Sequence, residues 1–499
     1  MNNLSNMKLG TRDSLLAKTQ STLIKNEIEK NTGLTFDLHS IKTQGDQITD
    51  KPLWQLDGKD FFTKELDKML IENQVDLVVH SYKDLGSERP PQIELAAITK
   101  RNYPNDILLI KKSKLEELSS LESFIVGTSS PRRIQNINHS LKDYLPNIKE
   151  SLEVSCKVLR GNVNTRIQKL RDDKYDAIVL AHAGLERLAL KAESSKILEE
   201  LLEGITFMIM PQKDFPSSAS QGALALEINK SASNDLRNAI KTVHCEKTSL
   251  EIEQERKVFN SFGGGCHLAV GIHVKTVHDY KVCITKGIHE NNIISEEEIM
   301  NFDYSNLQNK SAYFVFSDND FLISKIPIQS DKASDNLFVT SSNCFHNVKN
   351  YETLWTAGSR STKALTKMGH WINGSSEGFG DKEIEKLKNS KSLQAMINSR
   401  TWKVLSHSRA SSSLGEVLPS YSHQINEHLK SSKLEEIKNA DIIYWSSEIQ
   451  YKEYIKQIPE IKNKLHACGL GKTYEKLKKH NIEIIPFISM NHMKDKIKG

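Results

Sequence analysis

V-G-T-S-S-P-R-R (126–133), L-R-G-N-V-N-T-R (159–166) and A-G-L-E-R (183–187) are three turn-forming segments that each carry arginine. Arginine is otherwise scarce, since the 499 residues contain 14 arginines and 54 lysines. A guanidinium binds a carboxylate or phosphate through two parallel hydrogen bonds, which a lysine ammonium cannot do. Surface salt bridges are the alternative, but they are a less common use of arginines gathered on Gly/Ser turns. The pattern predicts a site for a small molecule with many carboxylates. Its arginines are Arg132, Arg133, Arg160, Arg166 and Arg187.

These segments are nearly repeated elsewhere in the chain. L-G-T-R-D-S (9–14) resembles residues 126–133, and D-L-V-V-H-S-Y-K-D-L (76–85) resembles residues 176–185. Each reads as a buried parallel strand, a small polar turn and the start of a helix. Ligands of open α/β sheets bind beyond the carboxyl ends of the strands, where helix N-termini present free N–H groups. The repeat therefore predicts two α/β lobes with a cleft between them.

A smaller unit is expected after these two lobes. Residues 211–227 are predicted to return the chain to the first lobe. Residues 240–300 read as an α+β unit with a helix over 249–259 and strands around Val270 and Val282.

The last third of the chain contains a second near-repeat. L-F-V-T-S-S (337–342) parallels I-I-Y-W-S-S (442–447), and T-A-G-S-R-S-T-K-A-L (356–365) parallels residues 466–477. Each is again strand, polar turn and helix start. A second bilobal α/β module is therefore predicted.

Composition narrows the class of protein. Hydrophobic residues make up 38% and charged residues 26%, which is typical of a globular chain. No apolar run approaches the length of a membrane span, and the N-terminus has no apolar signal core, so we expect a cytoplasmic protein that binds no membrane. A net charge of +5 is too small to indicate nucleic acid. No C-x-x-C pair occurs among the six cysteines, so neither a disulfide framework nor a metal site is expected.

Four short features could take part in binding or catalysis. Cys266 follows three glycines, so its thiol is either a nucleophile and covalent anchor on an exposed loop or a small buried residue on a turn. Lys83-Asp84 ends an apolar strand, where the carboxylate either stabilises a developing positive charge or caps the next helix. The hydroxyls of Ser14 and residues 128–130 either bind the same anion or cap helices. The polar loop 44–62 reads as a lid over the cleft or as a connector.

In this order, the motifs resemble hydroxymethylbilane synthase, also called porphobilinogen deaminase, over about residues 7 to 300. Besides the arginine segments, they are L-G-T-R-D-S-x-L-A-x-x-Q (9–20), T-Q-G-D (43–46), G-K-x-F-F-x-K-E-L (58–66), V-V-H-S-Y-K-D (78–84), Y-D-A-I-V-L-A-x-A-G-L-x-R (175–187), S-Q-G-A-L-A-L-E (220–227) and G-G-C (264–266). The resemblance implies three domains and one covalent dipyrromethane cofactor per chain. It implies an enzyme that deaminates porphobilinogen, joins four units to this primer and releases hydroxymethylbilane by hydrolysis.

The resemblance also implies roles for individual residues. Cys266 would hold the dipyrromethane by a thioether, and Asp84 would stabilise positive charge on the pyrrole nitrogen as ammonia leaves, with Lys83 as the second catalytic residue. The cofactor contacts are then Cys266, Arg132, Arg133, Ser129, Lys83 and Asp84. The substrate contacts are Arg12, Ser14, Arg160, Arg166, Arg187 and Gln221. Ser220 and Asp60 stand where glycine is usual, and residues 267–270 depart from the usual Q-V-P run; none of these changes removes a charged catalytic group.

Residues 310–499 resemble uroporphyrinogen-III synthase, a two-lobed family that closes the linear tetrapyrrole into a ring. The resemblance rests on the two S-S turns, the two helix starts after them and a strand over 402–406. The candidate contacts are Thr340, Ser341, Arg360, Ser408, Ser446, Ser447 and Thr473. Asn426 stands where that family often has tyrosine, and the alternative is an inert appendage.

Together these expectations define an α/β multidomain protein. It has two periplasmic-binding-protein-like lobes, a small α+β domain and a second bilobal α/β module. The expected boundaries are 1–103 with 208–240, 104–207, 241–303 and 310–499. The expected function is a bifunctional transferase and lyase of porphyrin biosynthesis whose partners are porphobilinogen and the linear tetrapyrrole, and nothing in the sequence indicates more than a monomer. The alternatives are a deaminase with an inert C-terminal module and a two-lobed binding protein for small anions.

Overall fold

The chain divides into two compact units in the computed structural model, which describes residues 6–43, 45, 63–265, 267–315, 321–328, 336–346, 348, 350–426 and 431–498. The first unit contains Met1–Val274, Ile284–Ser295 and Asn389–Met396. The second contains Lys275–Cys283, Glu296–Lys388 and Ile397–Gly499. No helix in the described ranges is both long enough and apolar enough to cross a membrane.

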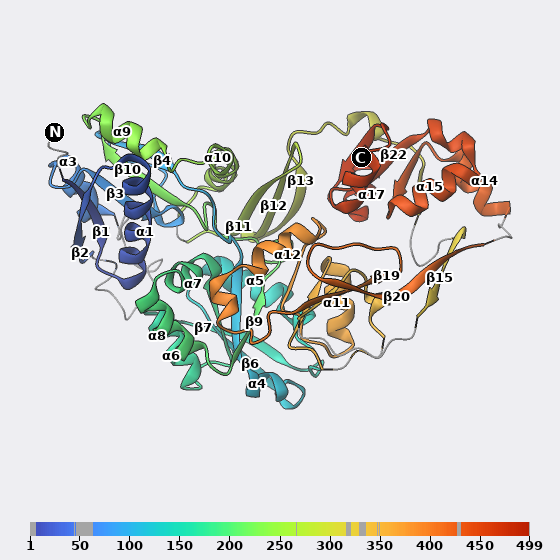
Figure 1. Ribbon diagram of the computed structural model, residues 1–499, viewed down its shortest axis with the longest axis horizontal. Coiled ribbons are helices and arrows are strands. Elements are labelled where there is room, and N and C mark those ends of the chain that lie inside the picture. Colours follow the sequence, from blue (N-terminus) through green and yellow to red (C-terminus); the bar gives the residue numbers. More distant parts are fainter. Residues whose placement is uncertain are drawn as a thin grey trace. The chain divides into compact units, whose positions relative to one another are not determined.

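The first sheet of the first unit has the order β2-β1-β3-β10-β4. β1 runs parallel to β2 and β3, whereas β10 is antiparallel to β3 and β4. Figure 1 shows helices α1 and α9 beside this sheet. The strands are β1 (Met7–Arg12), β2 (Phe36–Ile41), β3 (Leu77–Ser81), β4 (Ile93–Ile98) and β10 (Leu224–Asn229), and the helices are α1 (Leu15–Thr32), α3 (Lys64–Ile71) and α9 (Asn234–Lys241).

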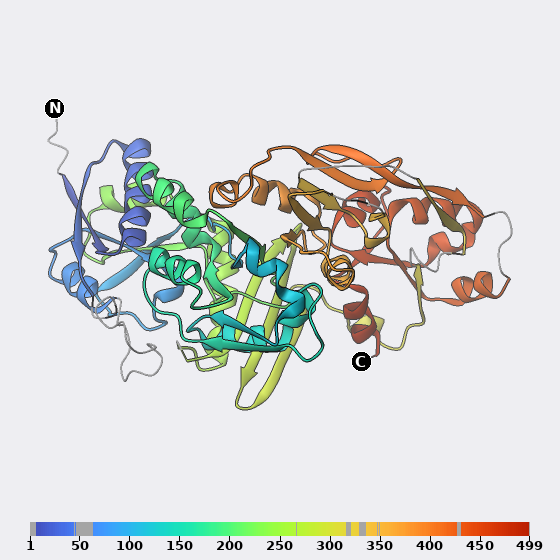
Figure 2. The ribbon, with the colours of Figure 1, turned by 90° about the horizontal axis from the view of Figure 1, so that it is seen from below.

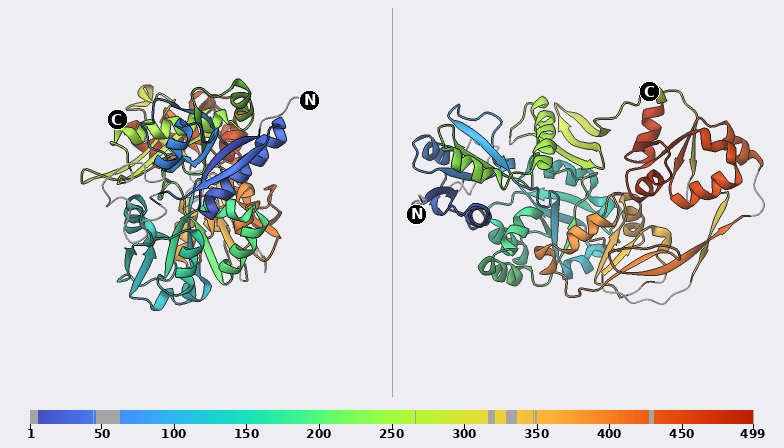
Figure 3. Two further views of the ribbon diagram at one scale, coloured as in Figure 1. Left: turned by 90° about the vertical axis from the view of Figure 1, so that its left-hand side faces the viewer. Right: turned by 45° about the horizontal axis from the view of Figure 1, so that its top comes forward.

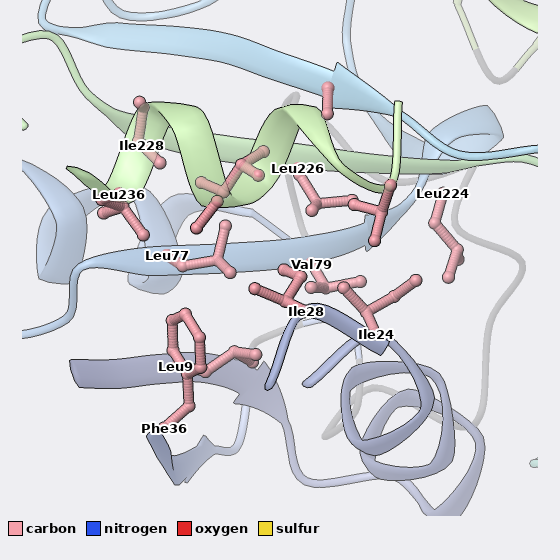
Figure 4. Close-up of a cluster of buried hydrophobic side chains, with 14 residues drawn as sticks. Leu9, Ile24, Ile28, Phe36, Leu77, Val79, Leu224, Leu226, Ile228 and Leu236 are labelled. Carbon is pink, nitrogen blue, oxygen red and sulfur yellow. The ribbon is translucent and has the colours of Figure 1, made fainter. Parts of the chain in front are cut away.

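A hydrophobic core joins this sheet to α1. Ile24 and Ile28 are one helical turn apart on α1, and both are buried against Leu9 of β1 and Leu226 of β10 (Figure 4). The i, i+4 spacing places both isoleucines on one face of the helix. Burying each such side chain stabilises the fold by about 1.5–3 kcal/mol. The apolar face of α1 therefore fixes the helix, and the turn before it, on the sheet.

The second sheet of the first unit has the order β7-β6-β8-β5-β9. β6 is parallel to β7 and β8, whereas β5 is antiparallel to β8 and β9. Residues 99–105 and 210–223, here called the two crossovers, connect the first sheet to the second. The elements are β5 (Asp106–Lys111), α4 (Lys112–Glu116), β6 (Ser123–Gly127), α5 (Pro131–Ser140), β7 (Glu153–Lys157), α6 (Val163–Arg171), β8 (Ala177–Ala181), α7 (His182–Ala189), α8 (Ala192–Leu202) and β9 (Ile205–Ile209).

A three-stranded sheet follows helix α10 (Glu246–Ser261) in the order β11-β12-β13. Its strands are β11 (Ala269–Val277), β12 (Tyr280–His289) and β13 (Asn292–Ile299), seen as long yellow-green arrows in Figure 2. The helix predicted over 249–259 and the strands predicted around Val270 and Val282 are confirmed, and α10 is longer at both ends than expected.

Glu255 of α10 joins the helix to both crossovers and to β11. Its carboxylate accepts two hydrogen bonds from the Arg101 guanidinium at 2.7 and 2.9 Å, and one each from the N–H groups of Ser220 and Val274. Burial by itself would raise the pKa of Glu255, but Arg101 and His273 lower it from 4.5 to about 2. The ionised carboxylate is therefore stabilised by folding.

This shift predicts that acid removes the contribution of Glu255 to stability. A carboxylate whose pKa is lowered by folding stabilises the protein fully above its unfolded pKa, and this contribution is lost as the pH falls toward the folded value. Replacing Glu255 by Gln is expected to cost about 3 kcal/mol at pH 7, and this cost should shrink between about pH 4.5 and pH 2. Thermal unfolding of the wild-type protein and of Glu255→Gln, compared at pH 7 and across this pH range, measures the cost.

Glu253→Gln is the matched control because Glu253 is exposed on the same helix. It should change the free energy of unfolding by no more than about 0.5 kcal/mol at any pH. A cost of Glu255→Gln that is the same at pH 3 and pH 7 would contradict the prediction.

The second unit is built on two further sheets (Figure 3, right, red and orange). One is parallel throughout, in the order β14-β21-β22-β23, and the other has the order β15-β20-β19-β16-β17-β18. Their strands are β14 (Ala312–Val315), β15 (Ile323–Pro327), β16 (Asn336–Val339), β17 (Thr353–Thr356), β18 (Gly374–Ser375), β19 (Trp402–His407), β20 (Glu416–Ile425), β21 (Ile442–Trp445), β22 (Leu465–Gly469) and β23 (Ile484–Phe487). The helices after β14 are α11 (Ser359–Lys367), α12 (Asp381–Lys388), α13 (Lys391–Gln394, in the first unit), α14 (Ser431–Asn439), α15 (Glu448–Gln457), α16 (Lys472–Lys478) and α17 (Met490–Lys498).

The second near-repeat has the local structure that its sequence predicts. The strands of the two S-S turns are β16 and β21, and the helices predicted after residues 358 and 471 are α11 and α16. The described residues form five sheets, and in all but the three-stranded sheet β11-β12-β13 helices lie between strands along the chain, so the described part is mixed α/β.

Candidate functional site

The loops that carry the predicted site residues follow the carboxyl ends of parallel strands. Lys83 and Asp84 lie in a short 3₁₀ turn (Tyr82–Asp84) directly after β3. Arg132 and Arg133 lie in the first turn of α5, after β6, and Arg187 lies on α7, after β8. Because parallel strands end at the same edge of a sheet, this topology places Lys83 and Asp84 in the loops of the first sheet, and the three arginines in the loops and helix starts of the second.

A buried carboxylate, Asp106, organises the centre of the site. It pairs with Arg132 at 2.8 Å and accepts two hydrogen bonds from Arg133, at 3.1 and 2.7 Å. The Gln221 amide also donates to it at 2.9 Å. Burial alone would raise the pKa of Asp106, but the two guanidinium groups hold it far below its usual range. Asp106 starts β5 and was missed by the sequence analysis, because no motif surrounds it.

Asp106 also fixes how the two arginines can act. Arg133 donates from three nitrogens, two to Asp106 and one to the Val179 carbonyl. Arg132 donates to the Pro216 carbonyl at 2.7 Å as well as pairing with Asp106. Both side chains are buried, so surface salt bridging does not describe them.

Lys83 is connected to this cluster through Gln221. Its ammonium donates to Gln221 Oε1 at 3.2 Å. Burial lowers the pKa of Lys83 to about 8, with Asp84 opposing this shift and Arg133 adding to it. An ammonium with this pKa gives up its proton nearer to neutral pH than an ordinary lysine does.

Asp84 is an exposed carboxylate among cations. Within the described part of the chain its side chain makes no hydrogen bond or ion pair, although the charge of Asp84 acts on both Lys83 and Arg166. It is the last residue of the 3₁₀ turn and caps no helix, so the capping alternative does not hold. The carboxylate is therefore open to a ligand.

Arg160 and Arg166 come from the loop and first turns of α6. Burial lowers the pKa of Arg166 to about 10, and Arg133 and Arg160 add to this shift. Its Nε donates to the Gly161 carbonyl at 2.7 Å. Gly161 has a φ of +113°, and a Cβ there would lie 2.9 Å from Thr165 Cγ2, so this turn requires glycine. Mutual repulsion of the three arginines is relieved when an anion binds between them.

The remaining predicted residues have structural partners. The Ser129 hydroxyl donates to the Leu159 carbonyl at 2.8 Å and so connects two arginine-bearing loops. Ser14 caps α1 by accepting from the Ala17 N–H, and Arg12, half-buried, ends β1. Arg187 is buried and donates to the Gly222 carbonyl at 2.6 Å.

The second crossover explains one departure from the expected motif. Ser220 has a φ of 67°, in the left-handed region that favours glycine. Its N–H donates a hydrogen bond to Glu255. This bond compensates for the cost of the left-handed backbone conformation, which is about 1–2 kcal/mol for a residue other than glycine. Next to Gln221, Gly222 has a φ of +96°, and a Cβ there would lie 2.0 Å from the Asn102 carbonyl oxygen. The two crossovers therefore touch at a position that only glycine fits.

Comparison with known proteins assigns this half of the chain to a family. Residues 7–237 match the family model described as porphobilinogen deaminase, dipyromethane cofactor binding domain. A probable porphobilinogen deaminase of Methanococcoides burtonii is 36% identical over 266 residues, which are 53% of this chain and 77% of that protein. The chain belongs to the porphobilinogen deaminase family. A porphobilinogen deaminase of Prochlorococcus marinus is 33% identical over 304 residues, or 60% of this chain and 89% of that one.

Among solved structures, a periplasmic sulfonate-binding protein of Methylobacillus flagellatus KT is 10% identical. The match covers 52% of this chain and 73% of that protein, with a TM-score of 0.28.

As a deaminase family member, the chain has the family's dipyrromethane-binding domain. A dipyrromethane carries carboxylate side chains, and three mutually repelling arginines near Asp84 fit such a polyanion: Arg133 is buried, and Arg160 and Arg166 are half-buried. Cys266, the proposed attachment point, and the predicted lid, apart from Gly45, lie outside the described residues.

The second unit contains a separate polar cavity of about 410 Å³. Six of the seven predicted contacts line it, namely Thr340, Ser341, Arg360, Ser446, Ser447 and Thr473. Ser408 does not, and neither does Asn426, which bonds the Phe321 carbonyl. The sequence analysis missed the basic lining residues Lys325, His407, His423, Lys472 and Lys476. Burial, the largest cause, lowers the pKa of His407 to about 4.

Proposed function

We propose that the deaminase part of this chain joins four porphobilinogen units into hydroxymethylbilane on a dipyrromethane held by Cys266. The observation that carries the proposal is the exposed Asp84 carboxylate, which has no hydrogen-bond or ion-pair partner in the described part of the chain and lies near Lys83 and Arg166. When bound, the dipyrromethane supplies the pyrrole end to which new units are joined. The domains proposed for this part are 1–103 with 208–240, 104–207 and 241–303, in a cytoplasmic protein.

Asp84 and Lys83 are proposed to act at the reacting carbon. Breaking the C–N bond of porphobilinogen releases ammonia and leaves positive charge on the pyrrole nitrogen, which the Asp84 carboxylate stabilises. Lys83, with a pKa of about 8, holds or passes the proton that the leaving nitrogen takes up. Carbon–carbon bond formation then returns one proton to the site, so the charge there is restored for the next unit.

The arginines are proposed to hold the side-chain carboxylates of cofactor and product. Arg160 lies in the loop before α6 and Arg166 in the first turn of that helix; both are half-buried, so they can follow an anionic chain as it grows. Three nitrogens of Arg133 already donate hydrogen bonds to Asp106 and to the Val179 carbonyl, so the main role of Arg133 is to set the charge and shape of the site. The proposed lining is completed by six further residues, namely Ser14, Ser129, Arg12, Arg132, Arg187 and Gln221.

The purified full-length protein tests this proposal directly. Incubated with porphobilinogen, it is expected to release one ammonia for each unit joined and a product that oxidises to uroporphyrin. A two-lobed anion-binding protein, the alternative from another class, would bind the compound and release no ammonia.

A second function, closure of the tetrapyrrole ring, is proposed for the C-terminal module, residues 310–499. The cavity in the second unit supports it, because hydroxyls on several turns and the cations Lys325, Arg360 and Lys472 surround one space. Such a lining suits a flexible molecule with many carboxylates. An inert module remains the competing interpretation, and the two differ in product.

Arg360→Ala separates these two interpretations. After incubation with porphobilinogen and oxidation, the wild-type protein should give mainly the type III isomer of uroporphyrin. The variant should shift the product about tenfold toward type I, because one bidentate carboxylate contact contributes roughly 1.5–3 kcal/mol. Arg400→Ala is the control, since Arg400 is exposed and does not line the cavity. If the wild-type protein gave only the type I isomer of uroporphyrin, the C-terminal module would lack the ring-closing activity.

A further inference from the structure

A buried polar cluster on helix α7 lies outside the candidate deaminase site. The helix is buried along its length, and His182 and Glu186 on it are 0% and 4% exposed. They occupy the two open positions of the motif A-x-A-G-L-x-R (181–187). Neither has a role in the proposed reaction, and a buried carboxylate needs strong partners to compensate for its loss of water.

The partners of Glu186 come from residues 389–396, far along the chain but within the first unit. The Ser390 and Ser392 hydroxyls both donate to Glu186 Oε2, at 2.6 and 3.0 Å. The backbone N–H groups of Lys391 and Ser392 also donate to the carboxylate, each at 3.0 Å. In the described ranges Glu186 has no cationic partner, so these four donors compensate for its burial.

His182 completes the buried polar cluster by donating a hydrogen bond to the serine hydroxyls. Its Nε2 lies 3.0 Å from the Ser390 hydroxyl oxygen and 3.2 Å from that of Ser392. Because both hydroxyl protons go to Glu186, Nε2 must carry the proton shared with these oxygens. Burial keeps the imidazole neutral by lowering the pKa of His182 to about 3. The hydrogen bonds are therefore all donated in one direction: His182 donates to the two serine hydroxyls, and these donate to Glu186.

The buried polar cluster also contacts the first crossover. The Tyr103 ring stacks on His182 with 4.4 Å between ring centroids, and the Asn105 carbonyl accepts from the backbone N–H of His182. Arg187, next to Glu186, donates a hydrogen bond to the Gly222 carbonyl of the second crossover. α7 is thus tied to both connections between the two sheets of the first unit.

We infer that Tyr103, His182 and Glu186 form a receptor site for a Ser-x-Ser peptide turn, occupied within the same chain by residues 389–396. The occupant lies beyond residues 7–237, the part that matches the deaminase family model. Its docking holds α7 and the first crossover in place. This inference requires neither of the proposed activities.

Hydrogen–deuterium exchange on the full-length protein tests the inference. Glu186→Ala removes the acceptor of four hydrogen bonds, so amides of residues 390–394 should exchange about tenfold faster or more. Amides of residues 101–105 and of α7 should also exchange faster. The control is Glu193→Ala, which removes an exposed carboxylate from the next helix and should match the wild-type protein.

The double variant Ser390→Ala/Ser392→Ala gives the same test while Glu186 is kept, should Glu186→Ala fail to fold. Faster exchange in residues 390–394 and 101–105 would support the receptor site. Exchange within about twofold of wild type in residues 390–394, in the variant that folds, would overturn it. Faster exchange confined to residues 389–396 would overturn the claim that docking holds the crossover.

Discussion

Replacing Asp84 by Ala is expected to lower the rate of porphobilinogen consumption at saturating substrate by a hundredfold or more. The proposed role of the carboxylate is to stabilise charge that appears only as ammonia leaves, and removing one such electrostatic group typically costs about 10²–10³ in kcat. Stability should change by less than about 0.5 kcal/mol, because Asp84 is exposed and bonds no described side chain. Ammonia release and thermal unfolding of the same preparation separate the two effects.

Asp172→Ala is the matched control for this prediction. Asp172 is an exposed carboxylate at the end of α6, where it accepts a hydrogen bond from Gln168. It should keep wild-type turnover, since it lies outside the proposed site. Turnover of Asp84→Ala within about threefold of wild type would contradict the assignment of Asp84.

Replacing Cys266 by Ser is expected to remove the covalent dipyrromethane completely, and with it all formation of hydroxymethylbilane. A thiol must ionise to act as a nucleophile, and burial raises the pKa values of Cys156 and Cys468 to about 12. Those two thiols stay protonated at neutral pH and are poor attachment points. Intact mass of the denatured variant measures the loss.

Cys156→Ser serves as the control for Cys266→Ser. It removes a half-buried thiol of β7 and should leave the covalent adduct in place. An adduct that persists in Cys266→Ser, or disappears in Cys156→Ser, would place the attachment elsewhere.

Local sequence patterns predicted the elements and many site positions because each depends on short-range chemistry. The helix at 249–259 and the strands of both near-repeats follow from apolar runs next to polar turns. Arg132 and Arg187 were found because they lie in motifs with Gly or Ser, and Gln221 was found because the segment S-Q-G-A-L-A-L-E (220–227) resembles the family motif. The structure brings Arg132 and Gln221 to one carboxylate.

That carboxylate, Asp106, was not predictable in the same way. It begins the antiparallel strand β5 in an apolar run, and only tertiary structure places it between Arg132 and Arg133. The same holds for Glu255, which reads as one acid among many on a charged helix but bonds both crossovers. Partners far apart in sequence leave no local pattern.

In the second unit, turn residues were again easier to predict than strand residues. Thr340 and Ser446 were chosen for their positions after strands, and both line the cavity. Lys325 and His423 lie on two strands paired antiparallel, β15 and β20, and a single lysine or histidine on such a strand carries no signal of its own. Ser408 follows β19, but its N–H bonds the Tyr421 carbonyl and it does not reach the cavity.

The most direct test of the account is the intact mass of the wild-type protein, measured before and after a brief exposure to porphobilinogen. The account predicts a starting mass above that of the polypeptide by one dipyrromethane, followed by a series of heavier species that differ by one pyrrole unit each. A starting mass equal to that of the bare chain, unchanged by porphobilinogen, would contradict it.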